Sequence, residues 1–107
     1  MTHDEFSQLL GEIVNDMERT MASKNHEYAP GKDKLANFKK SARSLGVTPQ
    51  QCLWYFCQKH LTSVQDIVNG ETAYSNELLR EKCGDIRNYT VLLEALMLEE
   101  HSESSNQ

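Results

Sequence analysis

Hydrophobic positions recur at helical rather than strand intervals along most of the chain. Residues 2–24 carry apolar side chains three or four positions apart, namely Phe6, Leu9, Leu10, Ile13, Met17 and Met21. Residues at this spacing share one face of a helix. Similar segments cover Thr48 to Asn69 and about 76–100, and no stretch alternates with the two-residue period of a strand. The pattern therefore predicts an all-α protein.

Residues at the ends of these segments act as helix start and stop signals. Thr2 and Glu5 have the spacing of a capping box. A second capping box is expected from Thr48 to Gln51, with Pro49 at the first helical position. Glycines favour the left-handed conformation that ends many helices. The expected helix ends include Gly46 and Gly70.

A short helix is expected between the first and third segments, capped by Asp33. It would bury Leu35, Phe38, Ala42 and Leu45. The apolar arc of the third helix is centred near Leu53 and Ile67, and that of the last near Leu93 and Tyr89. We therefore expect an antiparallel helical bundle of three long helices and one short helix, one domain over residues 1–100 with a disordered polar tail over 101–107.

Composition describes one soluble globular domain, with 107 residues, 38% hydrophobic and 25% charged. No cationic, apolar leader or membrane span is evident, and three cysteines without CxxC spacing suit a reducing compartment, so a cytoplasmic location is expected. The net charge is −5, yet residues 24–43 hold six Lys and Arg against two acidic residues. Such a basic strip could attract a small phosphorylated ligand, whereas binding to duplex nucleic acid is not expected.

Two helical segments carry polar residues where their pattern requires a core. On the third helix, His60 lies in the middle of the apolar arc and Lys59, Ser63 and Asp66 follow one side; on the last, Glu81, Lys82, Asp85 and Asn88 lie in or beside the arc. We expect these stripes to face each other as a polar seam. Lys82 could pair with Asp66 or Asp85, and Lys59 with Glu81.

Two interpretations of this seam remain open. It could be a self-satisfied ion-pair network that sets helix register, or it could floor a ligand pocket. Gly84 favours the pocket, because a mid-helix glycine costs about 1 kcal/mol relative to Ala and suggests close approach by another group. For His60 alone, a hydrogen-bonded core histidine is favoured over a metal ligand. Trp54 and Tyr55 could stack on a base, but packing is the favoured interpretation.

The polar residues and the loop before them resemble a known family. The segments are Lys24 to Tyr28, Asp33, Asn37-Phe38, Lys59-His60-x-x-Ser63-x-x-Asp66 and Glu81-Lys82-x-x-Asp85-x-x-Asn88-Tyr89. Together they resemble the nucleotide-modification-associated helical domains of phages and prophages and, more distantly, the MazG-type all-α NTP pyrophosphatases. The resemblance covers roughly residues 24–98.

The resemblance implies a phage-type nucleotide-binding protein active in nucleotide metabolism or modification. It implies that Asp66, Glu81 and Asp85 would hold Mg²⁺, with Glu27 or Asp33 added from the loop. The nucleotide would be bound by Lys24, His26, Tyr28 and Lys32 as a lid and by Lys59, His60, Ser63, Lys82, Asn88 and Tyr89. The Glu-Glu-x-x-Glu cluster of the pyrophosphatases is missing, so phosphate recognition is favoured over metal-driven hydrolysis.

Two alternatives come from other classes of protein. The first is a non-catalytic protein that sequesters a nucleotide, such as a defence signal, and returns it unchanged. The second is a helical module for protein interaction, in which the seam is only structural. Under all three hypotheses the wide apolar arc of the third helix favours a homodimer or another homo-oligomer.

Overall fold

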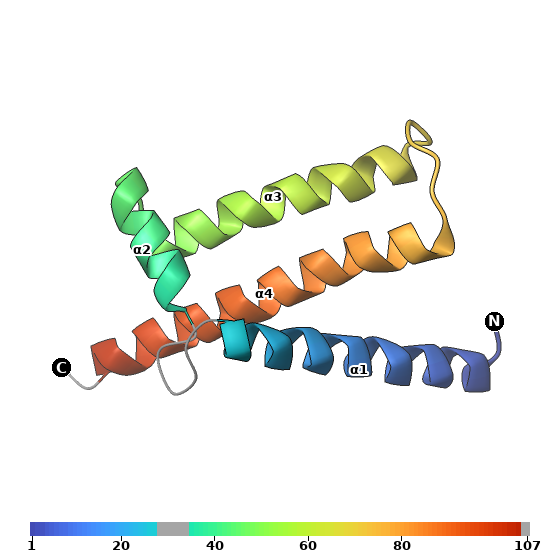
Figure 1. Ribbon diagram of the computed structural model, residues 1–107, viewed down its shortest axis with the longest axis horizontal. Helices are drawn as coiled ribbons and strands as arrows, with labels where there is room; N and C mark the ends of the chain where they lie inside the picture. Colours follow the sequence, from blue (N-terminus) through green and yellow to red (C-terminus); the bar gives the residue numbers. More distant parts are fainter. Residues whose placement is uncertain (28–34, 106–107) are drawn as a thin grey trace. The chain divides into compact units, whose positions relative to one another are not determined.

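A computed structural model describes the backbone of residues 1–27 and 35–105, and the side chains of residues 1–22 and 35–103 (Figure 1). These residues form four α-helices and no strand. The helices are α1 (His3–Glu27), α2 (Ala36–Leu45), α3 (Pro49–Val68) and α4 (Asn76–Ser105). The all-α class predicted from the sequence is confirmed.

The chain divides into two compact units, Met1–Lys32 and Asp33–Gln107. In the first, the Thr2 Oγ1 atom accepts a hydrogen bond from the Glu5 amide at 3.1 Å and caps α1. The helix runs to Glu27, three residues beyond its predicted end at Lys24. Among residues 1–22, whose burial is described, no side chain is buried.

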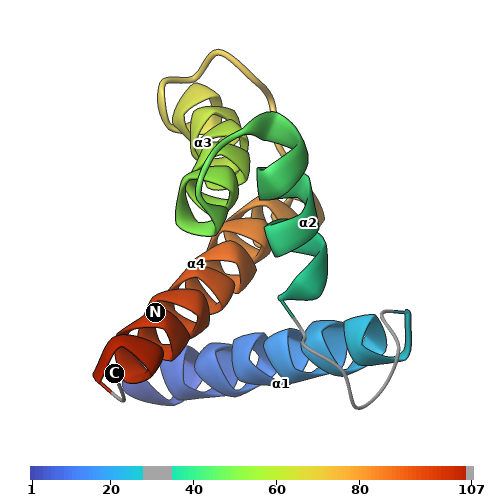
Figure 2. The same cartoon turned by 90° about the vertical axis from the view of Figure 1, so that its left-hand side faces the viewer.

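The second unit is organised around α3 and α4, which lie side by side and run in opposite directions (Figure 1). The short helix α2 packs against α3 near its N-terminal end (Figure 2). Leu53 and Leu96 are fully buried between these helices. The remaining buried side chains of the described core are Leu35, Ala42, Cys52, Cys57, Ile67 and Leu92.

Both predicted glycine stops end helices as expected. Gly46 has a φ of 72° and its amide bonds the Arg43 carbonyl at 3.3 Å, while the next amide, that of Val47, bonds the Ala42 carbonyl at 3.0 Å. This is a Schellman arrangement, which satisfies carbonyls left free at a helix end. Gly70, with a φ of 75°, closes α3 in the same way.

The start of α3 also follows the prediction. The Thr48 Oγ1 atom accepts from the Gln51 amide at 3.2 Å, and the Gln51 side chain accepts from the Thr48 amide at 3.0 Å. Pro49 occupies the first turn, where its missing N–H costs nothing. For α2, the N-cap residue is Leu35, which makes no side-chain cap bond, and the expected cap Asp33 lies outside the described residues.

Several apolar side chains are exposed, including that of Leu45, which was expected in the core. Leu45 is 64% exposed because it is the last residue of a helix only ten residues long. Leu61 and Val68 are 38% and 77% exposed, since the apolar arc of α3 is wider than the surface that α2 and α4 cover. On α4, the buried residues are Leu92 and Leu96 rather than the predicted centre, which is only half-buried.

The last helix continues through Ser105, so residues 101–105 are helical rather than part of a disordered tail. The segment after Glu100 contains no Pro or Gly to stop the helix, and hydrogen bonds between successive turns need no apolar anchor. Residues 106 and 107 lie outside the described part of the chain.

Candidate functional site

The polar residues of α3 and α4 occupy the middle of the contact between the two helices. The α3 row repeats every three or four residues: Leu53, Phe56, His60, Ser63 and Ile67. The matching α4 row is Leu78, Lys82, Asp85, Tyr89, Leu92 and Leu96. Each row lies along one side of its helix, as in a coiled coil, so apolar layers flank a polar centre.

His60 is the residue through which α3 contacts this polar centre. Its Nδ1 atom lies 3.4 Å from the Asp85 Oδ2 atom, an ion pair when the imidazole is protonated. The His60 ring also stacks on Tyr89, with centroids 5.0 Å apart and planes at 29°. Tyr89 in turn meets Phe38 of α2 edge-on at 6.3 Å. One cluster therefore joins α2, α3 and α4.

The cluster lies at the margin of the core rather than inside it. The His60 and Asp85 side chains are 26% and 35% exposed. Among residues whose burial is described, no polar or charged residue is buried. The expectation that charged side chains of the seam lie in the core was therefore wrong. Half-exposed groups keep contact with water, and their desolvation cost is small. They are also accessible to a ligand.

The predicted ion pairs across the seam do not form among these described side chains. The Lys59 Nζ atom instead lies over the rings of Tyr55 and Phe56, 5.5 and 5.7 Å from their centroids. The register that brings His60 to Asp85 leaves Glu81 more than one helical turn from Lys59, which explains the difference.

The other predicted partners are likewise apart. The Ser63 hydroxyl donates to the Lys59 carbonyl at 3.1 Å, within its own helix. Within the described residues, neither Lys82 nor Asp66 forms an ion pair. Both side chains are half-buried and remain available to a ligand.

Two neighbouring residues of α4 carry buried polar atoms without a hydrogen-bond partner in the described structure. They are the Asn88 Oδ1 and Arg87 Nε atoms. An unsatisfied buried acceptor costs about 1–3 kcal/mol, so a side-chain rotation that brings it to the donor of a ligand would be favourable. Asn88 was predicted as a site residue and Arg87 was not. The only sequence signal for Arg87 is its position one turn after Gly84.

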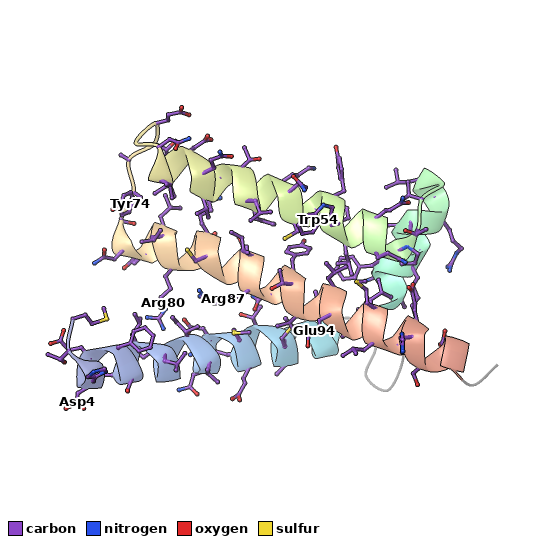
Figure 3. The ribbon with its side chains drawn as sticks, turned by 180° about the vertical axis from the view of Figure 1, so that it is seen from behind. Asp4, Trp54, Tyr74, Arg80, Arg87 and Glu94 are labelled. Atoms are coloured by element: carbon purple, nitrogen blue, oxygen red, sulfur yellow. The ribbon has the colours of Figure 1, made fainter. Side chains whose placement is uncertain are left out.

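Gly84 was expected to allow close approach by another group, and Arg87 is that group. A Cβ atom placed on Gly84 would lie 3.6 Å from the Arg87 Nη2 atom, which is ordinary van der Waals contact. Figure 3 shows Arg87 following Arg80, with Glu94 further along, on the side of α4 turned away from α3. The group nearest to Gly84 therefore comes from its own helix.

The predicted metal ligands are Asp66, Glu81 and Asp85. All three are described, and no group of three or more His, Cys, Asp or Glu within the described residues could hold a metal ion. Asp85 is engaged with His60 instead. The magnesium site stays a prediction. The possible additional ligands Glu27 and Asp33 lie outside the residues with described side chains.

The predicted lid also falls outside the described side chains. Lys24 and His26 belong by their backbone to α1, whereas Tyr28 and Lys32 lie in the segment that is not described. The structure therefore neither joins these four residues to the seam nor separates them from it.

Trp54 and Tyr55 were expected to pack, and this was wrong. Trp54 is 47% exposed and Tyr55 is 63% exposed. On the helical wheel Trp54 and Tyr55 lie about 100° and 200° from Leu53, outside the buried arc. The helical period by itself therefore places them at the surface.

The three cysteines are free thiols. Cys52 and Cys57 are buried, and Cys83 is half-buried. Burial raises the pKa of the Cys57 thiol, because the apolar surroundings disfavour the thiolate. Buried thiols of this kind pack as small hydrophobic groups.

Comparison with known proteins adds no relative. No family model, curated protein or solved structure matches the chain. None of the helices in the described ranges combines the length and apolar character needed to cross a bilayer.

Proposed function

We propose that this chain is a phage-type nucleotide-binding protein of the host cytoplasm, active in nucleotide metabolism or modification. The observation that carries the proposal is the buried acceptor of Asn88, which has no partner in the described structure. It lies one turn of α4 from Asp85, beside a half-exposed polar cluster. The amino group of a base is a donor of the kind that such an acceptor requires.

The surroundings of Asn88 supply the other parts of a nucleotide site. His60 and Tyr89 are already stacked, which makes a flat aromatic surface without further ordering cost. Lys82 is half-buried on the same helix, where it can supply charge for a phosphate. The cationic residues Lys24 and Lys32 would close over the phosphates, as the family resemblance implies.

The antiparallel bundle of all four helices belongs to the same proposal. The contact of α3 with α4 supplies one antiparallel pair. The apolar stripe of α1 predicts a further helix contact, because a helix with an apolar face needs a partner for it.

Thermal unfolding with a panel of nucleotides, with and without Mg²⁺, tests nucleotide binding. A nucleotide at a hundred times its Kd should add about 2.7 kcal/mol to the free energy of unfolding, a shift of several degrees in Tm. Asn88→Ala should weaken the best nucleotide at least tenfold. The matched control is Asn15→Ala, at an exposed position of α1, and should bind as the wild type does.

Two results would contradict nucleotide binding. One is a panel in which no nucleotide raises Tm under either condition. The other is equal affinity in Asn88→Ala and the wild type. Either would favour the interaction-module alternative.

Recovery of the bound nucleotide distinguishes binding from hydrolysis. We expect the nucleotide to be recovered intact, because the first acidic cluster of the pyrophosphatases is missing. Release of pyrophosphate that requires Mg²⁺ and is lost in Glu81→Gln and in Asp66→Asn would instead establish hydrolysis in the seam. Chromatography of the supernatant after denaturation measures both outcomes.

A further inference from the structure

Three exposed apolar residues follow one line along α3. Trp54 is 47% exposed, Leu61 is 38% exposed and Val68 is 77% exposed. They are seven residues apart, which is close to two helical turns, so they lie above one another on the same side of the helix. Figure 3 labels Trp54 on the side of the antiparallel α3–α4 pair, called the hairpin below, that is seen in that view.

The last helix adds a matching apolar row. Because α3 and α4 are antiparallel with His60 beside Asp85, a rotation of 100° per residue places four α4 residues on the same side of the hairpin. These residues are Leu79, Ile86, Leu93 and Met97, of which Met97 is 53% exposed and the others are half-buried.

The short helix α2 does not cover this side of the hairpin. It contacts α4 through Phe38 on Tyr89, and through the Lys39 Nζ atom at 2.7 Å from the Glu99 Oε1 atom. Tyr89 belongs to the row of α4 that faces α3, and Glu99 lies about 120° around the helix from Leu93, on the other side of that row.

We propose that the seven residues form a homodimer interface, which we call the Trp54 face, and that a second copy of this chain binds there. The face consists of Trp54, Leu61, Val68, Leu79, Ile86, Leu93 and Met97. None of these side chains is charged. Two copies of a chain with net charge −5 can therefore meet at this face without bringing like charges into contact.

The residues that border the Trp54 face on α3 are also compatible with the same residues of a second copy. Gln51, Gln58 and Gln65 are exposed and follow α3 at the same seven-residue spacing, next to the Trp54 row. An amide side chain both donates and accepts, so a glutamine row can hydrogen-bond to an identical row in either direction. A row of like charges could not.

The face has the size of an exposed apolar interaction patch and would supply about half of a standard interface. The distance along α3 from Trp54 to Val68 is about 21 Å, and two helices side by side are about 20 Å wide. The flat area is thus roughly 400 Å², which grows when the relief of the side chains is included. A standard interface buries about 800 Å² per partner, and exposed apolar patches of several hundred Å² commonly mark interaction sites.

The oligomeric state of the full chain tests this inference, which does not depend on nucleotide binding. In sedimentation equilibrium, the wild type should change from one to two chains per particle as its concentration rises. Leu61→Glu should weaken dimerisation at least a hundredfold, because each partner then places a carboxylate in an apolar contact. Leu45→Glu is the matched control, since Leu45 is exposed on α2 outside the face.

The single tryptophan gives a second measurement that needs no variant. Trp54 emission should shift to shorter wavelength over the same concentration range as dimerisation, because the indole loses contact with water. Three results would overturn the proposal: a monomer at every concentration, a dimer that persists in a helical Leu61→Glu, or dimerisation without a change in Trp54 emission. A monomer with a shielded Trp54 would indicate that another segment of the same chain covers the face.

Discussion

Gly84 and Gly46 are the two residues at which the absence of a side chain has opposite consequences. Gly84 lies in the middle of α4, where a Cβ atom would make an ordinary contact with Arg87 at 3.6 Å. Gly46 has a φ of 72°, a conformation that residues with a Cβ atom rarely adopt. Replacement by Ala should therefore stabilise the protein at Gly84 and destabilise it at Gly46.

Gly84→Ala should raise the free energy of unfolding by up to about 1 kcal/mol, because Ala has a higher helix propensity and space for its methyl group is present. Gly46→Ala should lower it by about 1 kcal/mol, through strain in the left-handed conformation. Urea unfolding of both variants measures the two changes. Destabilisation by Gly84→Ala would show instead that the added methyl group displaces the Arg87 side chain.

At the scale of the element, each helix end is determined by a few adjacent residues. The reciprocal bonds between Thr48 and Gln51 satisfy two amides that α3 itself cannot satisfy. The packing of α3 places His60 against α4 and buries Cys52, so the cap at the start of α3 also supports the candidate site.

Thr48→Ala should lower the free energy of unfolding by about 1 kcal/mol, within a range of roughly 0.5–2 kcal/mol, because the Gln51 amide loses its acceptor. Thr48→Ser retains the acceptor and should stay close to the wild type. Urea unfolding followed by circular dichroism gives both values. Equal loss in the two variants would mean that the methyl group of Thr48, and not the cap, carries the effect.

At the scale of the whole molecule, the two compact units differ in how their apolar residues are covered. The second unit has its own core around Leu53 and Leu96. In the first, Phe6 and Leu10 are more than half exposed, and no side chain among residues 1–22 is buried. Most of the stability of a helix in a protein comes from packing of its apolar face. The predicted bundle requires a further contact for α1.

Hydrogen exchange of the backbone amides tests this requirement. If the four helices form one bundle, the amides of α1 around Leu9 and Ile13 should exchange much more slowly than those of an isolated helix, and at rates approaching those around Leu53. Exchange in α1 near the rate of an unfolded peptide, while α3 stays protected, would contradict the bundle. The comparison within one sample serves as its own control.

The local features of the fold could be read from the sequence alone. The four helices, the capping box at Thr48 and the stops at Gly46 and Gly70 each depend on residues within about five positions of one another. Hydrogen bonding and backbone sterics act over that range, so no distant partner was needed. The buried centre of α3 at Leu53 followed equally from helical periodicity.

Contacts between helices depended on the tertiary structure, because register is a non-local property. The sequence placed His60 and Asp85 in facing stripes, but only the packing of α3 on α4 made them partners and left Lys59 over its own helix. The exposure of Trp54 and the unsatisfied acceptor of Asn88 likewise depend on which surfaces neighbouring helices cover. Periodicity gives the direction of a side chain, and only the fold determines what it meets.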